Sequence, residues 1–294
     1  MTTAPRVSIV IPTYNHAHFL GPALESVRAQ TMADWECLVV NNHSTDDTEA
    51  VVAAFADPRI RLINFHNHGI IAASRNQGLR AACGEWVAFL DSDDLWHPAK
   101  LERCLEAGDS ADVVSHPERF LKDGRIIHQT RVADPVRASF ESLLLEGNCL
   151  SPSAILVRRE RLLSLGGFSE DKDLVTAEDH DLWLRLARSG AVMAFVDAPL
   201  ADFRIHGEQN SSSVERHMNA SLAVLARHYP QLTPPAPWRY RRARAQVIYG
   251  AARTQQKLGR RGAALALLAR AFAIWPFLPK VPVAAALVLT GSAR

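Results

Sequence analysis

The stretch WVAFLDSDD, residues 86–94, joins five apolar residues directly to a cluster of three carboxylates. A short continuous apolar run is typical of a strand buried on both faces of a parallel sheet. Side chains alternate along an extended backbone, so Asp91 and Asp93 point the same way and can converge. Two close carboxylates repel each other unless a cation or a proton lies between them. A hard divalent ion, Mg²⁺ or Mn²⁺, is one solution, with a diphosphate completing its ligands. A solvated acidic turn that caps the next helix is the alternative.

Three earlier runs rich in Val, Ile and Leu resemble this strand: residues 7–11, 36–40 and 60–63. Segments with helical spacing of apolar residues lie between the four runs: roughly 17–29, 46–56 and 71–82. Short apolar strands that alternate with helices indicate βαβ units. With right-handed crossovers, they predict an α/β protein with a doubly wound, mostly parallel sheet and helices on both faces.

Polar clusters follow all four strands. After residue 11 comes PTYN, after residue 40 comes NNHSTDDT, and Asn64, His66 and Asn67 follow the third strand. In open α/β sheets, ligands bind in the crevice outside the carboxyl ends of the strands. One such loop is an ordinary turn, but four in succession favour a binding site at this edge.

Beyond Asp94 the pattern becomes mixed. Helices are expected at 98–107, 136–145 and 178–189, and strands at 112–115, 125–130 and 154–157. We expect this second half to be built onto the same sheet and not to form a separate domain. Residues 233–238 are rich in proline and predict a linker, followed by helices at 241–258 and 261–275.

Charge is distributed unevenly along the 294 residues. The net charge is +2, yet residues 1–215 carry 20 Lys and Arg against 31 Asp and Glu, whereas residues 216–294 carry 13 Lys and Arg and no acid. The 48% apolar and 22% charged composition is that of a globular protein. We expect an acidic body over 1–215 and a basic helical C-terminal region over 216–294.

The sequence lacks the signatures of several function classes. The chain has no Walker-type phosphate loop and no G-x-G-x-x-G, and an apolar signal segment does not precede the first strand. Charges and prolines interrupt the apolar stretch 263–289, which makes it a poor membrane span. The four cysteines have no CxxC spacing and are interpreted as reduced core thiols. These features favour a cytoplasmic protein.

A second acidic cluster, TAEDHD at 176–181, begins an amphipathic helix. Acids in the first helical turn interact favourably with the helix dipole, so capping is the simple explanation. Capping needs only one or two acids, however, and Glu178, Asp179 and Asp181 provide three. The surplus suggests a carboxylate that acts as a general base. His206 lies in a later polar loop, where a histidine is more often a surface residue than a ligand.

Taken in order, five segments resemble the family 2 glycosyltransferases, which have the GT-A fold. The segments are VSIVIPTYNHAHFLGPALESVRAQT, ECLVVNNHSTDDT, AASRNQGLRAACGEWVAFLDSDD, GGFSEDKDLVTAEDHDLWLRLARSG and FRIHGEQNSSS, which together span about residues 6–213. No single segment is decisive, but their order and spacing are specific. The resemblance implies transfer of a sugar from a nucleotide-sugar donor, usually with inversion, to a hydroxyl of an acceptor glycan or lipid-linked acceptor.

The resemblance also implies roles for individual residues. A divalent cation, Mn²⁺ or Mg²⁺, would be held by Asp91 and Asp93 with His206, and would assist departure of the nucleoside diphosphate. Asp179 would be the general base, with Glu178 as its substitute. The donor would be bound by the half of the body at about 1–97 and the acceptor by the half at about 98–215. The implied donor-binding residues are Pro12, Tyr14, Asn15, Asn41, Asn67, Arg75, Asp91 and Ser92.

One departure from the family pattern concerns the nucleobase. Relatives often carry a pair of acids after the second strand, one of which accepts a hydrogen bond from the base, and here Asn41 and Asn42 stand in their place. An amide can accept that bond through its carbonyl and can also donate through its NH₂. A UDP-sugar is the default donor, and the departure leaves the base open.

Two other functions compete with glycosyl transfer. A catalytically silent module of the same fold could bind a nucleotide-sugar or a glycan, and the paired asparagines are its only support. A nucleotidyltransferase would ordinarily show a loop rich in glycine and lysine after the first strand, where this chain has PTYN. The acids at 91, 93, 178 and 179 favour the enzyme.

The basic C-terminal region allows three interpretations. Its segments WRYRR at 238–242 and RR at 260–261 place positive charge beside aromatic and aliphatic residues. Such a region can bind an anionic membrane surface, or it can pack against the acidic body or a second subunit. A nucleic-acid patch is disfavoured because no accompanying binding motif is present. We therefore expect a cytoplasmic enzyme that binds no nucleic acid and is associated peripherally with the inner face of the membrane.

Overall fold

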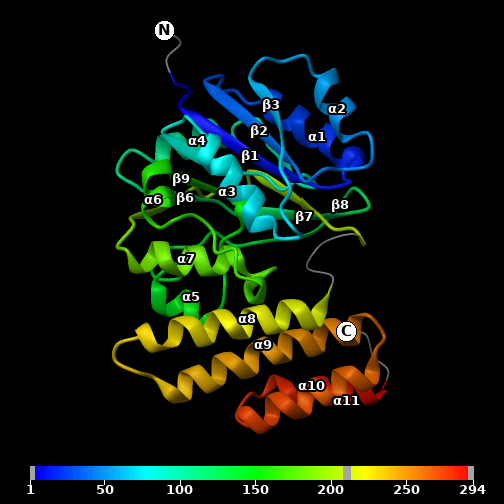
Figure 1. Ribbon diagram of the computed structural model, residues 1–294. Coiled ribbons are helices and arrows are strands. Elements are labelled where there is room, and N and C mark those ends of the chain that lie inside the picture. The colour runs from blue at the N-terminus through cyan, green and yellow to red at the C-terminus, as the bar shows by residue number, and fades with distance from the viewer. Residues whose placement is uncertain (1–3, 208–212, 291–294) are drawn as a thin grey trace. The chain divides into compact units, whose positions relative to one another are not determined.

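The computed structural model describes residues 4–207 and 213–290 (Figure 1). The chain divides into two compact units. Unit 1 comprises residues 1–139, 149–170 and 185–207, and unit 2 comprises residues 140–148, 171–184 and 208–294. Helix α7 (Glu178–Arg188) therefore contributes its first seven residues to unit 2 and its last four to unit 1.

The larger sheet of unit 1 has the strand order β10-β6-β9-β4-β1-β2-β3 within the described residues. Strand β9 is antiparallel to both of its neighbours, and the other pairs are parallel. The strands are β1 (Val7–Thr13), β2 (Trp35–Asn41), β3 (Ile60–Asn64), β4 (Trp86–Phe89), β6 (Val113–Ser115), β9 (Ile155–Arg158) and β10 (Met193–Phe195). The mostly parallel sheet and the four leading strands confirm the expectation from the sequence.

Helices cover both faces of this sheet. Along β1, Ile9 and Ile11 pack in one core cluster with residues of α1 (Ala17–Arg28) and α4 (Lys100–Ala107). Val10 points to the opposite face, where it meets α3 (Ile71–Ala81) at Gly78. Two short helices complete this half, α2 (Thr48–Ala54) and α6 (Arg159–Ser164).

A second sheet has the order β5-β11-β7-β8 within the described chain. Its strands are β5 (Leu95–Trp96), β7 (Glu118–Lys122), β8 (Arg125–Gln129) and β11 (Ala201–Arg204). The expectation that the whole second half joins one sheet is therefore wrong for these strands, although β6, β9 and β10 do join it. The hairpin β7–β8 is too polar to be buried on both faces, since every residue of β8 is exposed.

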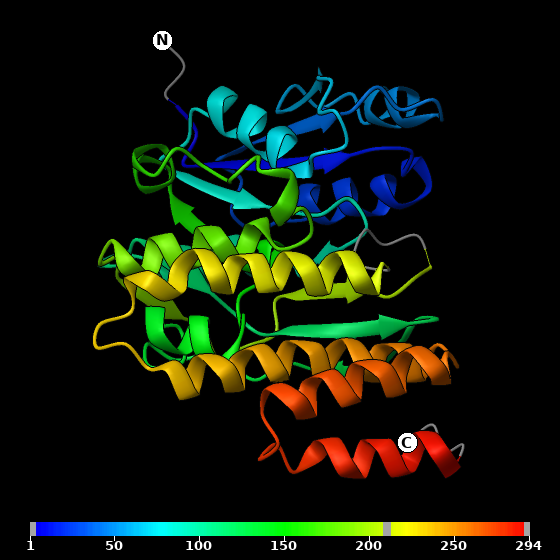
Figure 2. The same cartoon turned by 60° about the horizontal axis from the view of Figure 1, so that its bottom comes forward.

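Unit 2 is helical. Besides the start of α7, it contains α5 (Phe140–Glu146), α8 (Val214–His228), α9 (Pro237–Lys257), α10 (Arg261–Ile274) and α11 (Lys280–Thr290). The four C-terminal helices, coloured yellow to red in Figure 2, lie side by side in chain order. Their shared core includes Met218, Ile248, Leu268 and Val281.

The structure corrects several expected boundaries. Helix α5 begins at Phe140 and not at residue 136, because Asp134 forms a turn in which its side chain accepts from the Arg137 amide at 2.8 Å. Helix α9 begins within the expected linker, since proline is favoured at the first helical position and Pro237 occupies it. Cys83 is exposed and not a core thiol, whereas Cys37 and Cys104 are buried. Over the part of the chain that the structure describes, no helix is both long enough and apolar enough to cross a bilayer.

Candidate active site

The loops after β1, β2 and β3 are tied to one another by asparagine side chains. Asn15, at a positive φ of 51°, accepts a hydrogen bond from the Thr45 amide at 2.8 Å. Asn41 is fully buried, and its amide donates to Asn64 at 2.9 Å and accepts from the Ser44 amide at 3.0 Å. These two side chains hold the loops in place, so their amide groups are already engaged.

The remaining strand-end residues are of two kinds: some are buried and already hydrogen-bonded or packed, and one is exposed. Asn67 is buried, donates to Ser74 at 2.9 Å and accepts from the Gly69 amide at 2.8 Å. Pro12 is buried in β1. Tyr14, by contrast, is 53% exposed at the end of β1. Of the expected donor-binding side chains in these loops, Tyr14 presents the largest open surface to a ligand.

The carboxylates after β4 have specific nitrogen-bearing partners. Arg75, which is 3% exposed on α3, donates to Asp91 at 2.7 Å. His206 lies 2.8 Å from the Asp93 carboxylate, and its ring packs 4.3 Å from the Phe19 ring. The structure therefore brings His206 to the D-x-D cluster across more than one hundred residues of sequence. Residues 208–212 of the motif that contains His206 lie outside the described chain.

A third acid, Asp94, lies beneath the cluster. It is 1% exposed, accepts from the Ser153 hydroxyl at 2.6 Å and accepts from the Arg204 amide at 3.2 Å. Burial, followed by the negative charges of Asp93 and Asp91, raises the pKa of Asp94 well above its usual range. The two outer carboxylates are thus close enough to Asp94 to disfavour its ionisation.

Ser92 is buried, and its hydroxyl lies 3.0 Å from the His16 ring nitrogen. His16 comes from the loop before α1, so this contact joins the first strand-end loop to the D-x-D cluster. Sequence reasoning did not single out His16 or Arg204. Both lie within segments quoted for the family resemblance, but nothing in the sequence pattern marks either residue as a contact.

The side chains at this cluster could supply part of the coordination of a cation, with the remaining ligands coming from the substrate. Within the described residues, no group of three His, Cys, Asp or Glu side chains is placed to hold a metal ion unaided. Asp93 and His206 do converge, and they offer one oxygen and one nitrogen ligand. Mg²⁺ in proteins is commonly held by one or two carboxylates together with substrate phosphates. The pair therefore suits a cation whose remaining ligands are diphosphate oxygens.

The acids at the start of α7 have separate environments within unit 2. Glu178 is 5% exposed, and its carboxylate accepts from the Thr176 amide at 2.8 Å, which closes the turn before the helix. Asp181 is 1% exposed and lies 2.8 Å from the ring nitrogen of His228 on α8. Asp179 is partly exposed and accepts from the Asn148 side chain at 3.0 Å.

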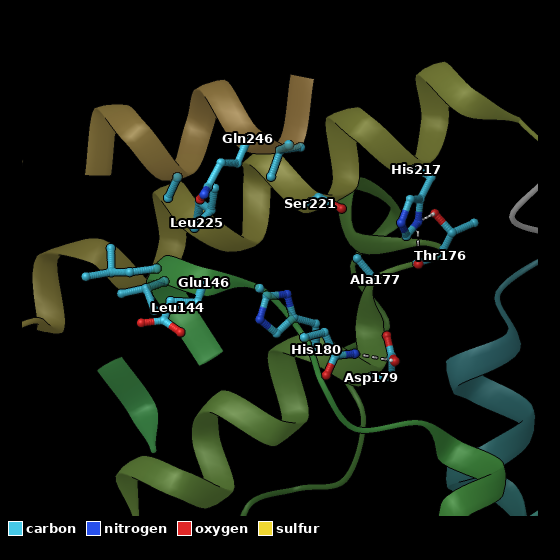
Figure 3. Close-up of a pocket in the computed structure, with 15 residues that line it drawn as sticks. Leu144, Glu146, Thr176, Ala177, Asp179, His180, His217, Ser221, Leu225 and Gln246 are labelled. Carbon is cyan, nitrogen blue, oxygen red and sulfur yellow. Dashed lines mark hydrogen bonds between the residues drawn. The ribbon is translucent and has the colours of Figure 1, made fainter. Parts of the chain in front are cut away.

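Asp179 lines a pocket in unit 2 with a volume of about 380 Å³ (Figure 3). The pocket is formed by the end of α5, the turn before α7, and one side each of α8 and α9. Its lining residues are Leu144, Leu145, Glu146, Gly147, Asn148, Thr176, Ala177, Asp179, His180, His217, Ser221, Leu225, Ala243, Gln246 and Val247. Neither Glu178 nor Asp181 is among them.

The turn that presents Asp179 is strained. Thr176 has a φ of 84°, a conformation that β-branched residues rarely adopt and that costs about 1–3 kcal/mol. Its amide donates to Glu178, and its carbonyl lies 3.0 Å from the Nδ1 atom of His217 on α8 (Figure 3). These two contacts hold the backbone before Asp179. Asn148 and His217 were missed by sequence reasoning, because each depends on a loop or helix distant in the sequence.

A mostly parallel α/β sheet with a D-x-D cluster at its strand ends defines the GT-A class of glycosyltransferases. The chain belongs to glycosyl transferase family 2, whose model matches residues 8–162. It is therefore a glycosyltransferase, which favours the enzyme over the silent binding module and the nucleotidyltransferase.

Individual proteins similar to this chain are also named as glycosyltransferases. An uncharacterized glycosyltransferase, alr2836 of Nostoc sp. strain PCC 7120, is 34% identical over 230 residues, covering 74% of this chain and 69% of the relative. The Escherichia coli protein WfgD, a UDP-Glc:alpha-D-GlcNAc-diphosphoundecaprenol beta-1,3-glucosyltransferase, is 32% identical over 192 residues, covering 64% of this chain and 72% of WfgD.

A solved structure shows the same fold. The mannosyltransferase PcManGT from Pyrobaculum calidifontis, determined with GDP-Man and Mn²⁺, superimposes with a TM-score of 0.61 at 24% identity. The match covers 99% of this chain and 80% of PcManGT.

Proposed function

We propose that this glycosyltransferase moves a sugar from a nucleotide-sugar donor to a hydroxyl of a glycan or lipid-linked acceptor, with inversion and with the help of Mn²⁺ or Mg²⁺. The substrates named for WfgD support a UDP-sugar donor and a diphospholipid-linked acceptor. The GDP-Man and Mn²⁺ of PcManGT support a divalent cation, and they leave GDP-sugars as alternative donors. Assembly of a surface polysaccharide or glycolipid is the corresponding role.

The division of roles among the three acids of α7 is the observation that carries this proposal. Glu178 closes the turn before the helix, and Asp181 is buried against His228. Asp179 alone of the three faces the pocket, where Asn148 orients its carboxylate. We assign Asp179 as the base that removes the proton from the acceptor hydroxyl as the sugar is transferred.

The donor is assigned to residues 1–97 together with His206. Asp93 and His206, with Asp91 beside them, would hold the cation, which neutralises charge on the departing nucleoside diphosphate. Arg75 fixes the Asp91 carboxylate, and His16 fixes the Ser92 hydroxyl. Tyr14 offers its exposed ring to the nucleoside. Orientation and charge stabilisation then supply most of the rate.

Matched substitutions at positions 178 and 179 test the base assignment. A glutamine at 178 keeps an oxygen that can accept from the Thr176 amide, so we expect Glu178→Gln to retain transfer within a few-fold. We expect Asp179→Asn to reduce transfer at least a hundredfold while leaving donor binding nearly intact, since general bases contribute 10²–10⁴-fold. The rate of transfer is measured from the release of nucleoside diphosphate. If transfer survives Asp179→Asn, or fails equally in Glu178→Gln, the assignment is wrong.

A thermal-shift screen tests the donor site. Ligands that bind the folded state raise the unfolding temperature by mass action. We expect UDP, GDP or one of their sugar derivatives to raise it, and Mn²⁺ to increase that shift. Asp93→Ala should remove the increment due to Mn²⁺. An increment that is unchanged in Asp93→Ala contradicts the cation assignment.

We also propose that the basic C-terminal region binds an anionic membrane surface peripherally, on the cytoplasmic face. Trp238 is 56% exposed and Phe277 is 76% exposed, and the ring of Trp275 lies 6.5 Å from Trp238 and 5.5 Å from Phe277. Aromatic residues with neighbouring arginines favour the headgroup region of a bilayer. This arrangement would place the enzyme beside a lipid-linked acceptor.

A further inference from the structure

We infer that the 380 Å³ pocket of unit 2 is the acceptor subsite, and that it takes a neutral sugar ring and not the anionic or lipid part of the acceptor. This inference rests on the proposed function, because it identifies the substrate that Asp179 deprotonates. The volume of the pocket lies within the range of small-molecule sites, about 300–1,000 Å³.

The charge of the pocket excludes phosphate. Its described lining contains the acids Glu146 and Asp179 and the histidines His180 and His217, but neither lysine nor arginine. Proteins bind phosphate groups with arginine, lysine or helix N-termini. The pocket borders the N-terminus of α7, but three carboxylates in the first turn of that helix would repel an anion. A ligand at this site is therefore neutral.

The polar groups of the pocket suit hydroxyls. Ser221 and Gln246 line it from α8 and α9, and both can donate and accept. The Nδ1 atom of His217 faces the Thr176 carbonyl and so carries the hydrogen in the neutral ring. Its Nε2 atom is then an acceptor for a hydroxyl. Sugars are among the few small neutral molecules that present several hydroxyls at once.

The apolar part of the lining suits the C–H face of a pyranose. Leu144, Leu225 and Val247 form it, and Leu144 and Leu225 come from different helices, α5 and α8 (Figure 3). Ser221 and Gln246 would face a polyprenyl chain that offers them no hydrogen bond, at a cost of about 1–3 kcal/mol each. The mixed lining thus favours a sugar over both other parts of a lipid-linked acceptor.

The inference places acceptor choice in the C-terminal region. The family model ends at residue 162, whereas His217, Ser221, Leu225, Ala243, Gln246 and Val247 come from α8 and α9. The family-wide segment supplies the donor site except His206, and these two helices supply most of the pocket walls outside that segment, where one acceptor would be distinguished from another. The basic region therefore has a role in specificity in addition to any membrane contact.

Saturation-transfer NMR with methyl glycosides tests the assignment. The probes are the methyl pyranosides of glucose, galactose, mannose, N-acetylglucosamine and rhamnose, with glucose 1-phosphate as the anionic counterpart. Ser221→Trp places an indole in the pocket, and Asn219→Trp places one on the exposed side of the same helix as a matched control. We expect at least one methyl glycoside to bind the full-length protein and the control, and to bind Ser221→Trp at least tenfold more weakly. Glucose 1-phosphate should bind more weakly than methyl glucoside.

Three outcomes overturn the inference: no methyl glycoside binds, the phosphate binds more tightly than the glycoside, or binding is equal in Ser221→Trp and Asn219→Trp. Retained thermal shifts with UDP or GDP show that a variant is folded.

The experiments distinguish failure of the subsite inference from failure of the proposed function. If a nucleotide-sugar is turned over but no glycoside binds at this pocket, the subsite is wrong and the enzyme assignment stands. If glycosides bind here but no nucleotide-sugar is consumed, the proposed reaction is wrong.

Discussion

Lys100 is a buried cation without a hydrogen-bond partner for its Nζ atom, which lies 3.4 Å from the centre of the Trp96 ring. Burial lowers the pKa of its ammonium group from the ordinary value of 10.5 to about 8. Between these pH values the unfolded chain holds more protons than the folded one, so the free energy of unfolding rises with pH from about 8 to 10.5.

We therefore expect Lys100→Met to raise the free energy of unfolding at pH 7 by about 3–4 kcal/mol, because the pKa falls from 10.5 to about 8 and each pKa unit corresponds to about 1.4 kcal/mol. The gain should shrink toward zero near pH 10.5, where the lysine is neutral in both states. Urea unfolding at pH 7 and pH 10 measures it. Lys122→Met, at an exposed position in β7, is the control. A gain that is the same at both pH values contradicts this explanation.

If Asp179 is the base, as proposed, Asn148 acts through it as a positioning residue. Its side chain donates to the Asp179 carboxylate at 3.0 Å. Hydrogen bonds to charged groups contribute about 1.5–3 kcal/mol. We expect Asn148→Ala to lower kcat about tenfold or more with an unchanged KM for the donor, and Asn148→Ser to recover part of the loss. Steady-state kinetics with the donor varied provides the test. An increase in donor KM with unchanged kcat would assign Asn148 to donor binding instead.

The residues of the site were only partly predictable from the sequence. Motif order pointed to the acids at 91, 93 and 179 and to His206, and the fold places His206 beside Asp93. It did not separate the roles of Glu178 and Asp179. That distinction depends on the turn at Thr176 and on Asn148, which lies 31 residues away in the sequence. Periodicity along one helix carries no information about a contact from another loop.

At the scale of elements, helix α3 packs closely on strand β1 at Gly78. A Cβ atom on Gly78 would lie 2.3 Å from the Cγ1 atom of Val10, closer than side-chain atoms can approach. Gly250, in the interior of α9, has no atom within 4 Å of the corresponding position. These two helical glycines therefore make a matched pair.

We expect Gly78→Ala to lower the free energy of unfolding by about 1–3 kcal/mol, because inserting a methyl group into a packed core forces its neighbours apart. Gly250→Ala should raise it by about 0.5–1 kcal/mol, since alanine is the better helix former. Urea titration of the two variants measures both changes. Equal effects of the same sign would show that α3 does not pack on β1 in this way.

The elements that sequence patterns predicted best were the four leading strands. Strands β1, β2 and β4 are mostly apolar and buried, whereas the edge strand β3 is only partly buried, and each of the four was predicted to within two residues at its ends. Strand β7, with the sequence ERFLK, was missed because neither its alternation nor its composition is typical of a strand. Strand β7 forms because it pairs with β11 and β8, and this pairing is a tertiary interaction. Helix α8 was also not predicted, although its buried residues Val214, Met218 and Leu225 recur at helical spacing.

At the scale of the whole molecule, the separation of charge is the dominant electrostatic feature. Every Asp and Glu lies within residues 1–215, whereas the 13 Lys and Arg that follow have no acid among them in the sequence. Arg241 and Arg242 are exposed near the start of α9, beside Trp238. A juxtamembrane basic residue contributes about 1 kcal/mol to binding of an anionic bilayer. A region of this composition therefore has the charge needed to bind such a surface.

We expect the protein to sediment with vesicles of phosphatidylglycerol and phosphatidylcholine, but not with vesicles of phosphatidylcholine alone, and to be released by 0.5 M NaCl, where charges are screened. Reversing two charges in Arg241→Glu/Arg242→Glu should weaken this binding at least tenfold, and Trp238→Ala/Phe277→Ala should weaken it several-fold. Lys122→Glu/Arg125→Glu makes the same change of net charge at exposed positions of the β7–β8 hairpin and should have a smaller effect. If the two charge reversals weaken binding equally, net charge alone attracts the protein to the membrane and the C-terminal region is not its docking surface.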